Sequence, residues 1–131
     1  MSKYLIYPEL VFTDRTLLLA ALADLGYPEV EEGEFLPLFG YLGDQRSETA
    51  ELVIRRRSIG AASNDIGFTK TAQGYVPIIS EYDQRTLHGG RFLVELRSAY
   101  AEHVVDAVTQ RLHGMARRTV DGNVIKITVR Y

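Results

Sequence analysis

The sequence predicts an α+β fold, an open-faced sandwich in the style of the ferredoxin-like fold, with two helices on one face of a mainly antiparallel sheet. Two observations carry this prediction. Apolar residues recur at helical spacing around Leu22 and Val104, and they alternate with polar residues over 50–57 and 125–131. Packing the helices on one face of a sheet is the simplest way to bury both kinds of apolar surface.

The expected elements follow one another without linkers or repeats, so we expect a single domain over residues 1–131. Turn and cap residues set the bounds, and Asp121-Gly122 suits the type I′ turn of a hairpin. In chain order we expect a strand over 4–12 broken by Pro8, a helix over 15–25 capped by Thr13 or Asp14, a bulged strand over 35–43, strands over 50–57, 65–69 and 75–82, a helix over 91–113 ended by Gly114, and a hairpin over 116–131.

The composition is that of an ordinary globular protein: of 131 residues, 46% are hydrophobic and 24% are charged. The absence of cysteine removes thiolate chemistry and cysteine-ligated zinc and is compatible with a reducing cytoplasm. The longest wholly apolar run, residues 17–23, is far shorter than the ~20 residues of a membrane span. A net charge of −2 weighs against nucleic acid. We therefore expect a cytoplasmic protein that binds neither membranes nor nucleic acid.

The chain carries no metalloprotease, EF-hand, nucleophile-elbow or dinucleotide-binding motif. Its three histidines, His88, His103 and His113, cannot share one metal ion. His103 and His113 stand about 15 Å apart along one predicted helix, and His88 lies in a predicted loop. We expect no metal and no cofactor, and the sequence favours a binding protein over an enzyme.

Tyr100 and His103 could carry chemistry, because residues three apart are neighbours on a helix surface. If a carboxylate orients the imidazole, such a pair can perform acid–base catalysis. The alternative is structural: a core tyrosine whose hydroxyl reaches the sheet, with a half-buried histidine beside it.

Arg97 lies inside the same apolar stripe, and Arg111 repeats its position two heptads later. An arginine in such a stripe must extend its head to water or pair with a carboxylate. We expect Arg97 to be partly buried and paired with a carboxylate near a strand end: Asp65, Glu81 or Asp83. Alternatively, its planar guanidinium binds a small anionic ligand.

Three consecutive arginines, Arg55 to Arg57, could bind phosphate groups. Neighbouring residues of a strand point to opposite faces, so only Arg55 and Arg57 could act together. Glu48 and Glu51 are close enough in the sequence to neutralise them. We therefore expect a solvated strand edge here.

The stretch 35–43 concentrates apolar residues between one proline and two glycines. Only alternate side chains of a strand can enter one core, so half of them need another cover. We expect Leu36, Leu38 and Tyr41 to contact a partner. Alternatively, the N-terminal strand, or the same segment of a second copy in a homodimer, covers these apolar side chains.

Six short motifs occur in a characteristic order: Ala21-Leu22-Ala23-Asp24-Leu25-Gly26-Tyr27, Gly40-Tyr41-Leu42-Gly43, Ala50-Glu51-Leu52-Val53-Ile54, Asp65-Ile66-Gly67-Phe68, Tyr100-Ala101-Glu102-His103 and Asp121-Gly122-Asn123-Val124-Ile125. In this order the chain resembles the DUF1257 family, which includes the hypothetical chloroplast reading frame thirty-five of algal plastids and cyanobacteria. That family brings no established activity. The gene neighbours of its members include AAA-type ATPases, which implies an accessory role.

We therefore expect a non-enzymatic accessory or adaptor protein that binds a larger protein partner, such as an AAA-type ATPase. The alternative function is a small domain that binds an anionic ligand, or an enzyme, built from Arg97, Tyr100 and His103. A pocket beside those three residues would favour the second function, whereas a flat apolar patch or an open strand edge would favour the first.

Overall fold

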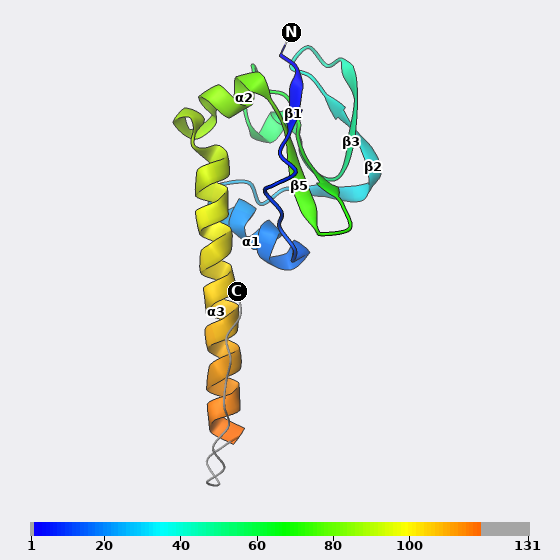
Figure 1. Cartoon of the computed structure of the whole chain (residues 1–131). Coiled ribbons are helices and arrows are strands. Elements are labelled where there is room, and N and C mark those ends of the chain that lie inside the picture. Colours follow the sequence, from blue (N-terminus) through cyan, green and yellow to red (C-terminus); the bar gives the residue numbers. More distant parts are fainter. Residues whose placement is uncertain (1, 119–131) are drawn as a thin grey trace.

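The computed structural model describes residues 2–118 and confirms the α+β prediction (Figure 1). Five strands form one antiparallel sheet in the order β1-β5-β4-β3-β2, so that β1 and β2 are its edges. The strands are β1 (Tyr4–Ile6), β2 (Glu31–Phe39), β3 (Gln45–Ile54), β4 (Ile66–Lys70) and β5 (Tyr75–Ser80). The helices are α1 (Arg15–Asp24), α2 (Glu81–Thr86) and α3 (Phe92–Arg118), and 3-10 turns occur at η1 (Arg56–Ser58) and η2 (Leu87–Gly90).

Of the two predicted N-caps of helix α1, Thr13 and Asp14, the structure has Asp14. The carboxylate of Asp14 accepts a hydrogen bond from the Leu17 amide at 3.0 Å, which satisfies one of the free amides of the first turn. The helix ends before Gly26, whose φ of +101° is readily adopted only without a Cβ. Between these caps, Leu18, Ala21 and Leu22 are fully buried. They join the main core, which lies between α1, the start of α3 and one face of the sheet.

A second, smaller core covers part of the other face of the sheet. It joins Tyr4 of β1 to Leu38 of β2, although these strands are opposite edges of the sheet, and it includes Ala50, Val53 and Ile78. The sheet curves around this cluster, because a Leu38 methyl group of β2 lies over Gly67 of β4, two strands away. Arg46 of β3 helps to hold this curvature, because its guanidinium lies 5.1 Å from the centre of the Tyr4 ring. The same group donates to the Ser2 carbonyl at 2.9 Å.

The C-terminal part of the prediction needs correction. Helix α3 does not end at Gly114 but continues to Arg118, so the predicted strand from residue 116 is wrong over residues 116–118. A glycine inside a helix costs only about 1 kcal/mol relative to alanine, which the flanking helix-forming residues can absorb. The rest of the predicted hairpin, residues 119–131, lies outside the described residues.

Several strand boundaries also differ from the prediction. Strand β1 ends at Ile6 instead of residue 12, and β3 spans Gln45–Ile54 instead of residues 50–57. Strand β2 begins at Glu31, four residues before the expected start, because β3 offers it an edge with which to pair. The expected strand over 75–82 ends at Ser80. The Ser80 hydroxyl accepts a hydrogen bond from the Asp83 amide at 3.1 Å, and this cap starts the short helix α2.

The close packing of the second core can be tested at Gly67 of β4. A Cβ at this position would lie 2.7 Å from the Ala50 Cβ and 3.1 Å from a Leu38 methyl group. We expect Gly67→Ala to lower the free energy of unfolding by about 1–3 kcal/mol through overpacking, measured by urea denaturation. Gly114→Ala is the matched control: its Cβ meets no atom within 4 Å, so it should stabilise the protein by about 1 kcal/mol. A neutral Gly67→Ala variant would contradict the curled sheet.

Candidate functional site

A buried carboxylate organises the end of the sheet where β2 and β3 meet the loop before β4. Asp65 is 1% exposed, and it accepts hydrogen bonds from the Arg56 amide at 2.7 Å and the Phe39 amide at 2.8 Å. Arg55 adds a charged hydrogen bond at 2.9 Å. A carboxylate can be buried only with such compensation. Asp65 therefore fixes the ends of β2 and β3 relative to each other.

The arginine run serves this network. Arg55 also donates to Glu31 at 2.6 Å and to the Pro37 carbonyl at 2.8 Å. The Glu31 hydrogen bond is the main cause of the raised pKa of Arg55, with Asp65 adding to it. In return, the Arg55 hydrogen bond lowers the pKa of Glu31. The expectation of a solvated edge neutralised by Glu48 and Glu51 is therefore wrong for Arg55.

The Arg56 side chain is likewise hydrogen-bonded within the protein, since its guanidinium donates to the Ser63 and Ala61 carbonyls at 3.2 and 2.8 Å. β3 ends at Ile54, and the 3-10 turn η1 follows. The turn removes the strand geometry on which the expected pairing of Arg55 with Arg57 depended. Of the three arginines, Arg57 is the exposed one.

Asn64 extends the buried network towards α2. Its amide and its side-chain nitrogen donate to the Asp83 carboxylate at 3.0 and 3.2 Å, and the side chain also donates to Ser80 at 2.9 Å. The Asn64 side-chain oxygen accepts from the Tyr41 amide at 2.9 Å. Because Asn64 is 1% exposed and Asp83 is 0% exposed, these bonds form a rigid floor beneath the loop that carries Tyr41.

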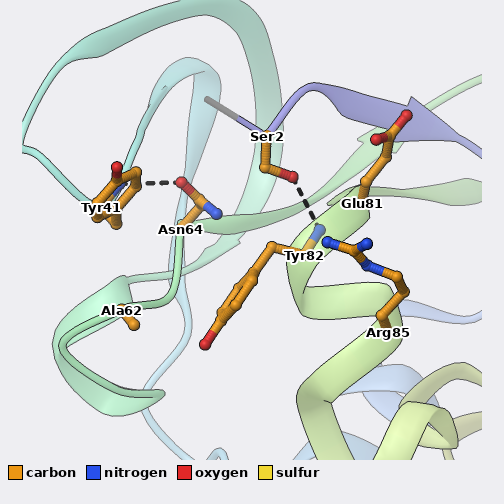
Figure 2. A pocket seen from close by; sticks show the side chains of 7 residues that line it. All are labelled: Ser2, Tyr41, Ala62, Asn64, Glu81, Tyr82 and Arg85. Carbon is orange, nitrogen blue, oxygen red and sulfur yellow. Dashed lines mark hydrogen bonds between the residues drawn. The ribbon is translucent and has the colours of Figure 1, made fainter.

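A pocket of about 490 Å³ lies over this floor, and we call it the Tyr41–Tyr82 pocket (Figure 2). Figure 2 shows the Tyr82 ring lying between Ala62 and Arg85. The Tyr82 amide donates to the Ser2 hydroxyl at 2.8 Å, so the N-terminal segment closes one wall. The pocket is lined mainly by aromatic, charged and polar residues: Ser2, Tyr41, Ala62, Asn64, Glu81, Tyr82 and Arg85.

The three residues that we expected to contact a partner lie in different environments. Leu38 is 0% exposed in the second core, so it cannot touch a partner of the folded protein. Leu36 is partly buried against the same core. Tyr41 is 40% exposed and lines the pocket. The apolar side chains most open to solvent in this stretch are Phe35 and Leu42, at 74% and 67%.

The residues of the alternative site, Arg97, Tyr100 and His103, are only partly brought together. Arg97 and Tyr100 line a groove of about 720 Å³ between residues 7–12 and α3, whereas His103 is not part of its lining. The His103 imidazole instead bonds the Asp24 carboxylate of α1 at 2.7 Å. The Tyr100 hydroxyl accepts from the Asp14 amide at 3.0 Å, so both polar groups are engaged in holding α3 against the N-terminal half of the chain.

The predicted burial of Arg97 is wrong. Its side chain is exposed, and the part of the chain that the structure describes shows no ion pair for it. Asp65 is bonded to Arg55 instead. The buried stripe of α3 contains Leu93 and Leu96, and one further residue along a helix rotates a side chain by about 100°. This rotation carries Arg97 out of the core.

A linked tyrosine, histidine and glutamate were not foreseen from the sequence. His88 lies 2.8 Å from the Tyr27 hydroxyl through Nε2 and 2.6 Å from Glu95 through Nδ1. In the neutral tautomer Nδ1 donates to the carboxylate and Nε2 accepts from the phenol. Burial, with smaller contributions from the Asp83 and Glu95 charges, raises the pKa of Tyr27.

Sequence separation explains why this cluster was missed: Tyr27 and His88 stand 61 residues apart. A local signal did exist, because His88 precedes Gly89 and Gly90, and all three adopt positive φ angles. This left-handed elbow turns the chain from α2 into α3. The cluster ties that elbow to Tyr27, the third residue after α1.

Asp65 provides a stability test of the network. Asp65→Asn leaves the Arg55 guanidinium, whose side chain is 17% exposed, without its buried carboxylate. We expect the variant to lose about 3 kcal/mol of unfolding free energy, measured by urea denaturation. Glu31→Gln removes the more exposed partner of the same arginine and should cost about 1 kcal/mol or less. Equal losses in the two variants would show that Asp65 does not organise this end of the sheet.

The raised pKa of Tyr27 predicts that the stability of the fold depends on pH. Because its folded-state pKa is raised, the protonated phenol contributes stability that is fully present below the unfolded pKa of about 10 and is lost as the pH rises through the folded pKa. Burial also raises the pKa of Tyr4, which adds to this alkaline loss. Urea midpoints should therefore fall above pH ~10, and less steeply in Tyr27→Phe. Parallel curves for wild type and variant would argue against a buried, bonded phenol.

Over the described residues, no helix is long and apolar enough to cross a membrane. Comparisons with curated proteins and with solved structures give no significant match. The model of a family of proteins of unknown function, DUF1257, matches residues 21–123. This range holds the last four residues of α1, the polar network and the Tyr41–Tyr82 pocket apart from Ser2. The chain therefore belongs to the DUF1257 family.

Proposed function

We propose that this protein is a non-enzymatic accessory protein that binds a larger protein partner through the Tyr41–Tyr82 pocket and the adjoining Leu42. The observation that carries this proposal is the composition of the surface. Two tyrosines and Arg85 surround one pocket, and the next residue along the loop, Leu42, is 67% exposed. Tyrosine and arginine are enriched among the residues that contribute most to protein–protein binding.

The pocket is held in shape before any partner arrives. The loop that carries Tyr41 is closed by a hydrogen bond from the Gly40 amide to the Asp44 carbonyl at 2.8 Å, and Asn64 bonds the Tyr41 amide from below. Gly43 adopts a φ of +79°, which lets the loop turn tightly. A preformed surface loses little conformational entropy on binding. This rigidity supports recognition of a folded partner.

The charges at the pocket indicate what the partner presents. Arg85 is exposed, and Glu81 is already paired with Lys3 at 3.7 Å. An acidic or hydrogen-bond-accepting side chain of the partner would therefore bind Arg85 while its apolar part packs on the tyrosine rings. We propose an AAA-type ATPase as the partner, on the strength of the family's gene neighbourhoods. The absence of cysteine supports a reducing, cytoplasmic setting.

An enzyme or anion-binding site at Arg97, Tyr100 and His103 is the weaker alternative. The Tyr100 hydroxyl is bonded to the Asp14 amide and the His103 imidazole to Asp24, so neither group is directed at a common point in the groove. These contacts explain both residues as structural.

The double variant Tyr41→Lys/Leu42→Lys tests the proposed surface. Both side chains are exposed, so the fold should survive, while two lysine ammonium groups in place of a tyrosine and a leucine would have to lose their water where the partner covers them. We expect affinity capture from the native cell, followed by mass spectrometry, to lose the partner at least tenfold in the double variant. Binding of the purified partner should show the same loss.

Ile6→Lys is the matched control, because Ile6 is 55% exposed on β1 and does not line the pocket. It should retain full capture. A double variant that keeps its urea midpoint and every partner would overturn the proposed surface, and a partner lost by both variants alike would point to a general charge effect. An AAA-type ATPase among the specifically lost proteins would support the named partner.

A further inference from the structure

Helix α3 carries a second, mainly apolar stripe beside the one that anchors it to the domain. Its residues follow one another at alternating spacings of four and three: Val94, Ser98, Ala101, Val105, Val108 and Leu112. The first four are exposed, with Val94 at 54% and Val105 at 47%. We call these six residues the α3 seam. A spacing that averages 3.5 residues is the pattern with which one helix packs against another in a coiled coil.

The seam is distinct from the stripe that anchors α3. Leu93 and Leu96 are buried in the main core, and Tyr100 packs edge-on against the Phe12 ring at 5.0 Å between centroids. At about 100° per residue, the centre of the seam lies about 130° around the helix from the centre of this anchoring stripe. Figure 1 shows α3 continuing well past the sheet. The seam therefore needs a neighbour that the sheet and α1 do not provide.

The charges beside the seam identify that neighbour. In coiled-coil terms, Val94 and Ala101 occupy d positions and Ser98 and Val105 occupy a positions. Arg97 and Arg111 then occupy g positions on one flank, and Glu95 and Glu102 occupy e positions on the other. In a parallel pair, a g residue faces the e residue five positions later on the other helix. Arg97 of one copy would thus face Glu102 of the second.

The opposite orientation is disfavoured by the same residues. An antiparallel pair brings g positions together, so that Arg97 and Arg111 would face like charges. Arg97 and Glu102 are both exposed, and no ion pair within the described residues engages either. The exposure of Arg97 thus has an explanation: it is the flanking charge of a helix–helix interface.

We infer that the α3 seam pairs in parallel with the seam of a second copy of this chain. The interface spans about 27 Å from Val94 to Leu112, at 1.5 Å per residue, so the pairing should depend on protein concentration. Tyr7, Leu10 and Val11 line the far wall of the groove beside Val94, Ala101 and Val105, which gives the second helix further apolar cover. The inference is independent of the Tyr41–Tyr82 pocket, which lies on other elements.

A charge-exchange series tests the pairing by sedimentation equilibrium on the full chain. Wild type should shift from monomer to dimer as its concentration rises. Arg97→Glu places like charges opposite Glu102 of the second copy, and Glu102→Arg does the same opposite Arg97, so each should weaken the dimer at least tenfold. An equimolar mixture of the two single variants should form a heterodimer, because the charges are then complementary. Glu34→Arg, an equal change of charge at an exposed position on β2, should leave the dimer unchanged.

The relative orientation of the two α3 helices can be determined with one introduced cysteine, since the chain contains none of its own. In a parallel pair, equivalent a positions face each other, so Ser98→Cys should oxidise to a disulfide-linked dimer. Gln110→Cys, which is exposed and lies away from the seam, should cross-link at least tenfold more slowly. A wild type that stays monomeric at all concentrations overturns the inference. The inference is also overturned if Arg97→Glu and Glu102→Arg dimerise as tightly as the wild type, or if Ser98→Cys and Gln110→Cys cross-link at the same rate.

Discussion

A carboxylate removed from water must find cations and amide donors, and Asp65 finds them on three residues near the ends of β2 and β3. The amides of Phe39 and Arg56 and the guanidinium of Arg55 all point at its two oxygens. These partners are the last residue of β2, the first residue of the turn η1 and the residue that joins β3 to η1. Since none of the donors could be withdrawn without leaving a buried charge unpaired, the position of Asp65 fixes the end of the sheet on which the pocket is built.

The curl of the sheet follows from the same region. The Tyr4 hydroxyl of β1 donates to the Asp65 carbonyl at 2.6 Å, and Leu38 of β2 fills the space beside Gly67. The two edge strands are thereby drawn towards one another across the second core. The curvature brings Ser2 close enough to bond the Tyr82 amide, so the N-terminal segment becomes a wall of the pocket. Fold and pocket thus depend on one set of buried polar groups.

The two surfaces that we propose for binding lie on separate parts of the molecule. The Tyr41–Tyr82 pocket belongs to the β2–β3 loop and α2, on the buried polar floor. The seam belongs to α3, which extends past the sheet (Figure 1). Two copies joined through α3 would each keep their pocket free. A dimer of this kind would present two equal pockets to a large assembly, and bivalent binding raises the apparent affinity without any new contact.

Much of this fold could be read from local patterns. The spacing of Leu18 and Leu22 predicted α1, and Asp14 was one of its two predicted caps. The alternation over 50–57 predicted the second half of β3, because a half-buried strand has an apolar side chain at every second residue. The Asp65-Ile66-Gly67-Phe68 motif marked a segment whose physical role became clear only in three dimensions.

Other features depended on partners far along the chain, which no local pattern specifies. Arg55 looked like a surface charge until the folded chain placed Asp65 and Glu31 against it. Leu38 looked available to a partner until the curl of the sheet buried it. The sequence by itself determined where α1, most of α3 and part of each strand lie, since spacing along the chain dictates both kinds of element. Only the tertiary structure decided which polar groups are buried together, because that depends on contacts between residues distant in sequence.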